Sequence, residues 1–190
     1  MNAFARIDVE TFFRFAAANT EQRYELERGV IVQQMTGGTK RHGLVARRLS
    51  QEIEAQIDMT RFTVLQDRGV GVSQSGRFPD IVVEPSDEPG ESLRTMRPVL
   101  IVEVLSPSTA ATDLNAKQME YLSIPTLDAY VVAHQDEPAV LVWARGENGE
   151  FPSEPIGLEG MDKTFDIKGR GFSARILFAD IYRGIAPGPR

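Results

Sequence analysis

The stretch Pro98-Val99-Leu100-Ile101-Val102-Glu103-Val104-Leu105 decides the fold, because it is apolar at nearly every position and rich in β-branched residues. Such a run predicts a strand, and apolar residues at successive positions predict a central strand that is covered on both faces. Glu103 breaks the pattern with a carboxylate. A carboxylate in this setting is costly unless a metal ion, a cation or hydrogen bonds compensate it. Glu103 therefore requires a compensating partner.

A second apolar segment carries an acid near its start: Phe78-Pro79-Asp80-Ile81-Val82-Val83-Glu84. It also predicts a strand, and we expect this strand to pair beside the one that contains Glu103. The connection between the two, residues 85–98, is polar and is expected to form no regular element. This pairing would bring Asp80 and Glu103 onto neighbouring strands.

A short helix is predicted at about residues 111–123, and Pro125 explains why it ends there. Asp113, Lys117 and Tyr121 are spaced by four residues within it, so the three side chains share one face. If that face packs on the sheet, the lysine can reach both carboxylates.

Two acids and a lysine fit metal-assisted hydrolysis. Asp80 and Glu103 would hold Mg²⁺ or Mn²⁺, which polarises a phosphoryl oxygen and acidifies a bound water. Lys117 would orient that water or neutralise the developing charge. The structural alternative is that Lys117 pairs with Asp113 on a solvated helix face. This alternative is weakened because both acids are predicted inside apolar strands, where a solvated charge is not expected.

The rest of the chain alternates between helical and strand patterns. Asp8 and Thr39 are the expected N-caps of two helices, and Arg28-Gly29 is the expected turn of a hairpin. This alternation indicates an α/β or α+β domain around a central mixed sheet. The predicted helices are 9–18 and 40–58, and the predicted strands are 23–27, 30–35, 62–65, 70–72, 127–132, 139–144 and 164–167, with a short turn near 177–182. Residues 62–65 and 70–72 form either two strands or one strand that Asp67-Arg68-Gly69 interrupts.

Length and composition restrict the class of protein. At 190 residues we expect a single domain over residues 1–190, with its core at about 9–182 and a frayed tail at 186–190. Cysteine is absent, which excludes disulfides, thiolate metal sites and cysteine nucleophiles. His42 and His134 are the only histidines, so any metal is expected to be a hard cation held by carboxylates rather than zinc.

The expected location is the cytoplasm, with no membrane partner. The first eight residues lack the apolar core of a signal peptide, and no apolar run approaches the roughly 20 residues needed to cross a bilayer. The net charge of −6 argues mildly against broad, non-specific binding of nucleic acid. It leaves room for a local basic groove.

At this point the chain shows a family resemblance. Pro79-Asp80, the run Ile101-Val102-Glu103-Val104-Leu105-Ser106-Pro107-Ser108-Thr109, and then Asp113, Lys117 and Tyr121 resemble the pattern of PD-(D/E)XK nucleases. More narrowly, the chain resembles the bacterial family of restriction-endonuclease-like proteins called Uma-two. The segment Tyr24-Glu25-Leu26-Glu27-Arg28-Gly29 and the helix with His42 match that family in the same order. The resemblance covers about residues 9–182.

The resemblance implies a restriction-endonuclease-like fold, with a four-stranded mixed core sheet flanked by helices. It implies that Asp80 and Glu103 bind the metal with the backbone carbonyl of Val104, and that Lys117 is catalytic. Leu105 stands two residues after Glu103, where the nuclease pattern has its lysine, and the resemblance implies that Lys117 replaces it from the helix. The implied substrate is nucleic acid, expected to be DNA. A homodimer is expected, because one nicking centre must be duplicated to cut both strands.

Four further residues have two interpretations each. Glu25 approaches the metal, or it forms a surface ion pair with an arginine on a neighbouring strand. His42 faces the metal ligands or a phosphate, although a hydrogen-bonded histidine at a helix start is the favoured interpretation. Asp113 orients Lys117, or it stabilises the first turn of its helix. Tyr121 is expected to pack rather than to take part in chemistry.

A basic run begins the helix predicted at 40–58. It fits contact with a phosphate backbone, although a solvated helix face is the commoner meaning of such a run. The residues are Lys40, Arg41, Arg47 and Arg48.

Three hypotheses follow for function. The first is a metal-dependent endonuclease centred on Asp80, Glu103 and Lys117. The second is a non-catalytic module that keeps the nuclease fold and binds a protein or nucleic-acid partner. The third is a hydrolase for another substrate, because a fold does not fix a function. Retention of all three residue types favours the first hypothesis over the second.

Overall fold

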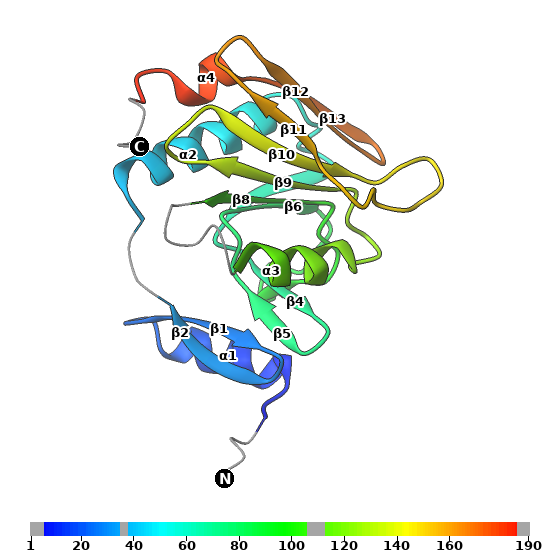
Figure 1. Cartoon of the computed structure of the whole chain (residues 1–190). Coiled ribbons are helices and arrows are strands. Elements are labelled where there is room, and N and C mark those ends of the chain that lie inside the picture. The colour runs from blue at the N-terminus through cyan, green and yellow to red at the C-terminus, as the bar shows by residue number, and fades with distance from the viewer. Residues whose placement is uncertain (1–5, 35–37, 106–112, 186–190) are drawn as a thin grey trace.

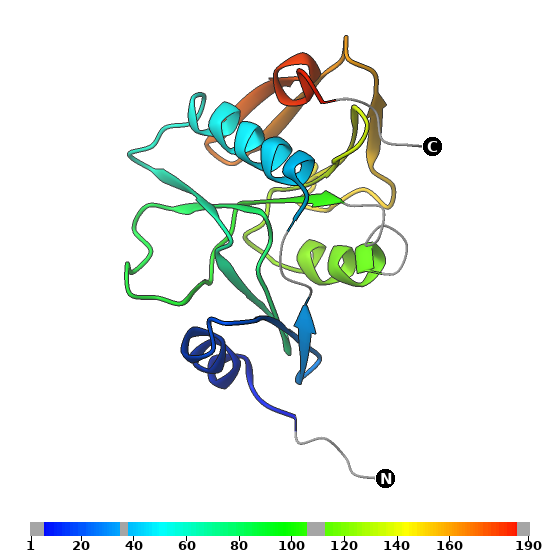
Figure 2. The same ribbon diagram turned by 90° about the vertical axis from the view of Figure 1, so that its left-hand side faces the viewer.

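The computed structural model describes residues 6–34, 38–105 and 113–185, except the side chains of 113 and 114 (Figures 1 and 2). The expected frayed tail at 186–190 and the segment 106–109 lie outside these residues. The helices are α1 (Val9–Ala18), α2 (Lys40–Glu54), α3 (Asp113–Leu122) and α4 (Phe178–Tyr182).

The strands form a larger and a smaller sheet and one separate hairpin. The larger sheet has the strand order β11 (Ile156–Glu159), β10 (Ala139–Ala144), β9 (Ala129–His134), β8 (Leu100–Leu105), β6 (Ile81–Pro85) and β3 (Phe62–Gln66). The smaller sheet has the order β2 (Val30–Gln34), β1 (Arg23–Glu27), β5 (Ser75–Arg77), β4 (Gly69–Val72) and β7 (Arg94–Thr95). The hairpin is formed by β12 (Thr164–Gly169) and β13 (Phe172–Leu177).

The larger sheet is mixed, as the sequence predicts. Strand β8 pairs antiparallel with β6 and parallel with β9, and α3 lies in the connection between the two parallel strands. Leu100, Ile101 and Val102 are completely buried, which confirms the prediction of a central strand covered on both faces.

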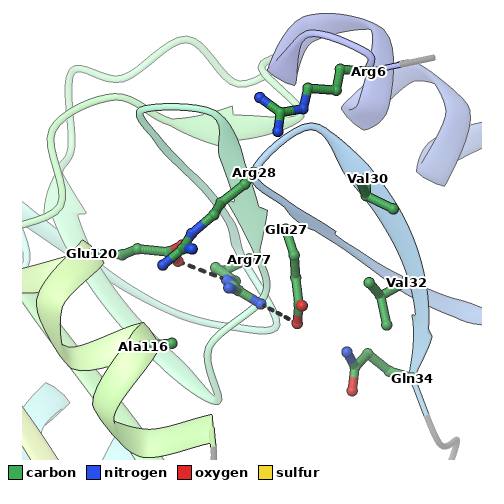
Figure 3. Close-up of a pocket in the computed structure, with 9 residues that line it drawn as sticks. All are labelled: Arg6, Glu27, Arg28, Val30, Val32, Gln34, Arg77, Ala116 and Glu120. Atoms are coloured by element: carbon green, nitrogen blue, oxygen red, sulfur yellow. Dashed lines mark hydrogen bonds and ion pairs between the residues drawn. The ribbon is translucent and has the colours of Figure 1, made fainter. Parts of the chain in front are cut away.

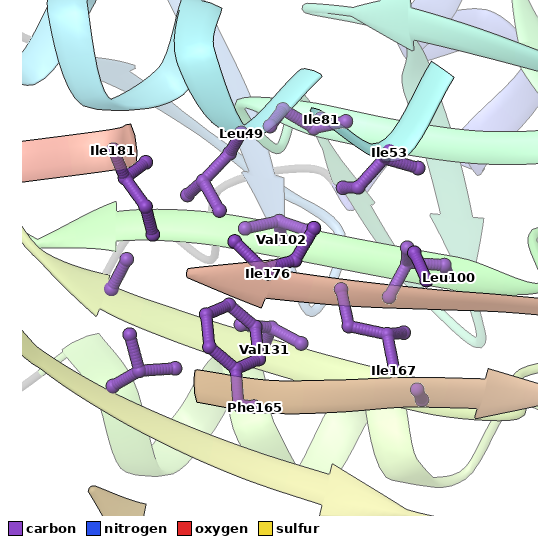
Figure 4. Close-up of a cluster of buried hydrophobic side chains, with 14 of the residues drawn as sticks. Leu49, Ile53, Ile81, Leu100, Val102, Val131, Phe165, Ile167, Ile176 and Ile181 are labelled. Atoms are coloured by element: carbon purple, nitrogen blue, oxygen red, sulfur yellow. The ribbon is translucent and has the colours of Figure 1, made fainter. Parts of the chain in front are cut away.

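The two faces of the larger sheet have different covers. Helices α2 and α4 and the β12–β13 hairpin lie over one face, where Leu49, Ile53 and Ile176 pack on Val102 and Val131 (Figure 4). Helix α3 lies on the opposite face (Figure 1). There Tyr121 joins a core with Ile101, Tyr130 and Trp143. Because side chains alternate along a strand, Glu103 projects to the α3 side.

The helix boundaries follow from local hydrogen bonds. The side chain of Asp8 accepts from the N–H of Thr11, and the side chain of Thr39 accepts from the N–H of His42, which confirms both predicted N-caps. Helix α2 ends at Glu54, earlier than the predicted residue 58. Asp58 instead accepts from the N–H and hydroxyl of Thr60, a local turn that competes with the helix.

Several predicted elements need correction. Strand β6 begins at Ile81, so Asp80 stands directly before the strand rather than inside it. The larger sheet has six strands, two more than the implied four-stranded core, and residues 178–182 form the helix α4 rather than a turn. Strands β5, β7, β11 and β13 were not predicted, because the first two are very short and β11 is an exposed edge strand. Strand β13 alternates between buried and exposed residues, a signal that was present in the sequence.

Candidate active site

Asp80 lies at the junction of β6 and β8. Because Ile81 pairs with Val102 in antiparallel register, the residue before β6 lies beside the carboxyl end of β8. The N–H of Val104 donates a hydrogen bond of 2.7 Å to Oδ2 of Asp80. The turn into β6 and this bond fix the carboxylate next to the strand that contains Glu103.

Glu103 is the carboxylate with the most altered acidity. Its side chain is 14% exposed, and burial raises its pKa to about 7, with repulsion from Asp80 and Glu25 acting in the same direction. Lys117 and a hydrogen bond from Tyr121 oppose this rise. The position therefore favours a further positive charge beside the carboxylate at neutral pH.

Helix α3 supplies two of the groups around Glu103. Its Tyr121 hydroxyl donates to Oε1 of Glu103 at 3.0 Å, and Nζ of Lys117 lies 4.0 Å from the same oxygen. Tyr121 is completely buried, and burial raises its pKa well above the ordinary value, so the hydroxyl remains a donor at neutral pH. Tyr121 thus packs, as expected, and it also holds a site carboxylate.

Glu25 enters the site from the smaller sheet. It is 6% exposed, its Oε1 lies 3.1 Å from Nζ of Lys117, and its Oε2 accepts from Nη1 of Arg77 at 2.8 Å. The expected ion pair with an arginine on a neighbouring strand is present, but it is buried rather than on the surface. Glu25 therefore joins the catalytic candidate Lys117 to a second cation.

Arg77 was not assigned a role from the sequence. Its side chain is 2% exposed, and besides Glu25 it contacts Glu27 at 3.1 Å and Glu120 at 2.9 Å (Figure 3). Burial lowers its pKa, but the bond to Glu120 and the charge of Glu25 more than offset this and hold the pKa above its ordinary value. The network links the smaller sheet to α3. It could not be anticipated, because its acids come from residues 25, 27 and 120.

His42 lies on the other side of Asp80 from α3. As the third residue of α2, its backbone N–H bonds to the cap Thr39, and its Nε2 lies 3.3 Å from Oδ2 of Asp80. The bond to Asp80 raises the pKa of His42 against the opposing effect of burial, and the backbone of Val104 also hydrogen-bonds to it. This confirms the interpretation as a hydrogen-bonded histidine at a helix start, and it places the imidazole against two predicted metal ligands.

The remaining candidates are less central. Asp113 is the first residue of α3, but its side chain lies outside the described part of the chain. Arg41 pairs with Asp136 at 2.7 Å, and Arg48 donates to the carbonyl oxygens of residues 181 and 183 at 2.8 Å. These two arginines form contacts with other parts of the fold. The basic run is therefore neither a wholly solvated face nor a free phosphate-binding surface.

The donors around Asp80 fit a hard cation of the Mg²⁺ type. Within the described ranges, no group of three or more histidine or acidic side chains converges as a ready-made metal cage. Mg²⁺ is usually held by one or two carboxylates together with waters and substrate phosphates, which matches a pair of acids and a backbone carbonyl. The Nε2 of His42 lies 3.3 Å from Oδ2 of Asp80, and the hydrogen bond to Asp80 and its negative charge raise the pKa of this imidazole, so the carboxylate favours a positive charge beside it. The residues therefore fit the implied metal.

Comparison with known proteins supports this interpretation of the fold. A crystal structure titled as a putative nuclease belonging to DUF820, from Anabaena variabilis, superimposes with a TM-score of 0.74 at 17% identity, covering 93% of this chain and 97% of that one. No helix in the described residues is long and apolar enough to span a membrane.

Relatives in sequence extend over most of the chain. The Synechocystis protein slr1290 is 27% identical over 96% of this chain and 95% of its own length, and sll1609 is 26% identical over 68% of this chain and 83% of its own length. The model of the Uma2 family, described as "Putative restriction endonuclease", matches residues 9–166. The chain therefore belongs to the Uma2 family.

Proposed function

We propose that this protein is a metal-dependent endonuclease that hydrolyses phosphodiester bonds at Asp80, Glu103 and Lys117. The observation that carries the proposal is the position of Lys117. Its ammonium lies 3.1 Å from Glu25 and 4.0 Å from Glu103, beside the junction where Asp80 is fixed. A largely buried lysine between two acids, beside the ends of β6 and β8, resembles a phosphoryl-transfer site more than a solvated ion pair.

Asp80, Glu103 and the carbonyl of Val104 would hold Mg²⁺ or Mn²⁺. When bound, the ion would polarise a phosphoryl oxygen and lower the pKa of a coordinated water. The described contacts of Glu103 engage only its Oε1, so within the described chain Oε2 is available to the ion. The donor set contains only oxygen, which suits a hard cation and not zinc.

The protein side chains orient and neutralise charge. Tyr121 holds one oxygen of Glu103, so the carboxylate cannot rotate freely. Glu25 holds the ammonium of Lys117, and a lysine fixed in this way can donate to a phosphoryl oxygen as negative charge develops there. His42, beside Asp80, keeps that carboxylate in its orientation.

The test combines metal binding with cleavage. Mn²⁺ binding is measured by calorimetry and cleavage is measured on plasmid DNA, single-stranded DNA and RNA. Asp80→Asn and Glu103→Gln should lose metal binding and reduce cleavage at least 100-fold, and Lys117→Met should bind metal but cleave at least 100-fold more slowly. The exposed Glu147→Gln and Lys163→Met are matched controls. Wild-type cleavage rates in folded Asp80→Asn and Lys117→Met would overturn the proposal.

One observation favours the non-catalytic alternative. The acids of the site already have partners in the chain, since Asp80 is bonded to Val104 and His42 and Glu25 is bonded to Arg77 and Lys117. Such a cluster can join two sheets without a metal. If the wild type binds no Mn²⁺ and the Asp80→Asn/Glu103→Gln variant is more stable, the protein is an interaction module on a nuclease fold.

The endonuclease proposal carries an expectation about assembly. A site that cuts one strand must be present twice to cut a duplex, so a duplex-cutting enzyme is expected to be a homodimer. Analytical ultracentrifugation determines this directly. A monomer at all concentrations would restrict the activity to nicking or to single strands.

A further inference from the structure

A cleft of about 760 Å³ opens between the β1–β2 hairpin and α3 (Figure 3). Strand β2 supplies one wall with Val30, Val32 and Gln34, which alternate along the strand and so face the same side. Helix α3 supplies the opposite wall with Ala116 and Glu120. The volume falls within the range of about 300–1,000 Å³ typical of pockets that enclose a small ligand.

The cleft adjoins the candidate active site through residues that contact Glu25 or neighbour Lys117. Two of its lining residues, Gln34 and Arg77, donate to Oε2 of Glu25 at 3.3 Å and 2.8 Å. A third, Ala116, directly precedes Lys117 on α3. A ligand in the cleft would therefore contact residues that adjoin the Glu25–Lys117 pair.

Two arginines reach into the cleft from the end opposite β2's Gln34. The guanidinium groups of Arg6 and Arg28 point into the space (Figure 3), and neither forms an ion pair or hydrogen bond with another described residue. The buried Arg77 differs, because its guanidinium group forms ion pairs with three carboxylates. Two guanidinium groups at a cleft are suited to bind phosphate oxygens in bidentate fashion.

The backbone fixes both arginines at the hairpin turn. Arg28 has a φ of 49°, in the left-handed region that is unfavourable for most side chains, and its N–H bonds to the hydroxyl of Ser75. Gly29 follows with a φ of 85°, and a Cβ there would lie 2.9 Å from the Cβ of Arg6. The N–H of Ile7 bonds to the carbonyl of Gly29 at 3.0 Å. A strained turn that directs two arginines toward one space is consistent with a binding role.

We propose that this cleft binds a single strand of nucleic acid and delivers it to Lys117, with phosphates at Arg6 and Arg28 and bases against Val30 and Val32. The inference rests on the proposed nuclease function and specifies its substrate class. Apolar contacts with base faces and cationic contacts with phosphates are the general means of binding single strands.

Burial of the reactive groups argues for a single strand over a duplex. The side chains of Asp80, Glu103 and Lys117 are only 14–16% exposed, and the side chain of Glu25 is 7% exposed. A strand can bend into such a recess. A nucleotide within a duplex must first be unpaired and unstacked, which costs a few kcal/mol.

The test measures binding without cleavage. Glu103→Gln protein in EDTA is titrated with fluorescein-labelled 12-mers of single-stranded DNA, single-stranded RNA and duplex DNA, followed by anisotropy at several salt concentrations. We expect single strands to bind at least tenfold more tightly than the duplex. Adding Arg6→Ala and Arg28→Ala should weaken single-strand binding at least tenfold and reduce the slope of log K against log salt by about 1.4, at about 0.7 for each phosphate that is no longer neutralised.

Two controls separate local from general effects. Arg47→Ala, an exposed arginine on α2, should bind as the parent does, and Arg6→Lys/Arg28→Lys should keep most of the affinity. Equal melting temperatures exclude unfolding. Duplex binding as tight as single-strand binding, or unchanged binding by the Arg6→Ala/Arg28→Ala protein, would overturn the cleft proposal even if the wild type cleaves. Arginine-dependent binding without Mn²⁺-dependent cleavage by wild type would instead overturn the proposed function and leave the cleft in place.

Discussion

Arg77 and Glu25 form a buried ion pair in which Nη1 lies 2.8 Å from Oε2, and the other oxygen of Glu25 lies 3.1 Å from the ammonium of Lys117. Arg77 comes from β5 and Lys117 from α3, so one carboxylate connects the smaller sheet to the helix beside the larger sheet. The position of Lys117 therefore depends, through Glu25, on Arg77, which has no described contact with Asp80 or Glu103.

Replacing Arg77 by Met should destabilise the protein by about 3–5 kcal/mol, because it leaves buried acids without their cation. Urea unfolding of wild type and Arg77→Met measures this difference. The double variant Arg77→Met/Glu25→Gln should recover about 1–3 kcal/mol relative to the sum of the single changes, since the neighbouring residues are coupled. Additive effects would show that the pair contributes nothing beyond its separate contacts.

Glu103→Gln should stabilise the metal-free protein at neutral pH. The folded pKa of about 7 lies above the ordinary 4.5, so this carboxyl supports folding fully below about pH 4.5 and loses that contribution as the pH rises through 7. One unit of pKa difference corresponds to about 1.4 kcal/mol, so the advantage of the variant should approach roughly 3 kcal/mol above pH 7. Unfolding in EDTA from pH 4 to pH 8 measures it. An advantage independent of pH would contradict the assigned pKa.

Tyr121→Phe should raise the pKa of Glu103 further, because it removes the hydrogen bond that favours the carboxylate. The ¹³C shift of the Glu103 carboxyl carbon, followed by NMR against pH in EDTA, reports this pKa. Tyr182→Phe is the matched control, since it removes another buried hydroxyl, which donates to the carbonyl of Ala139 at 3.1 Å. Both changes should cost about 1–2 kcal/mol of stability, and a shift of the Glu103 pKa in the control as well would contradict a direct effect.

Two glycine substitutions should act in opposite directions. Gly43 lies within α2 and a Cβ there would meet nothing within 4 Å, so Gly43→Ala should stabilise the protein by about 0.5–1 kcal/mol. At Gly76, a Cβ would lie 2.5 Å from the ring of Phe12, so Gly76→Ala should destabilise it by about 1–3 kcal/mol through the packing of α1. Thermal unfolding measures both. Stability changes of the same sign in the two variants would contradict the difference in free space around Gly43 and Gly76.

The sequence predicted the strands that carry or follow the site acids, because their patterns are local. The β8 run is apolar throughout, and Asp113, Lys117 and Tyr121 are spaced as on one helical face. The antiparallel pairing of β6 with β8 brings Asp80 beside Glu103, and the packing of Tyr121 on the sheet brings Lys117 to 4.0 Å from Glu103.

The parts that sequence patterns missed depend on distant residues. Ser75-Gly76-Arg77 has neither alternation nor β-branched side chains, and it forms a strand because β1 and β4 pair with it and Phe12 packs on Gly76. The burial of Arg77 likewise requires three acids from two distant segments, β1 and α3. Charged residues in a sequence are normally expected to be exposed to solvent. A buried cation with several acidic partners is therefore recognised only after the fold is known.

The position of β8 between its neighbours has a consequence for synthesis of the chain. Its partner β6 precedes it in the sequence, and β9 follows it beyond α3. A growing chain that ends after α3 contains every acid and the lysine of the site, but the side of β8 that pairs with β9 is still an unpaired edge with an exposed ladder of backbone groups. The site can then become rigid only when the second half of the protein has emerged and β9 has docked. Under the proposed function, a nascent chain would therefore cleave nucleic acid only after β9 has been synthesised and has docked.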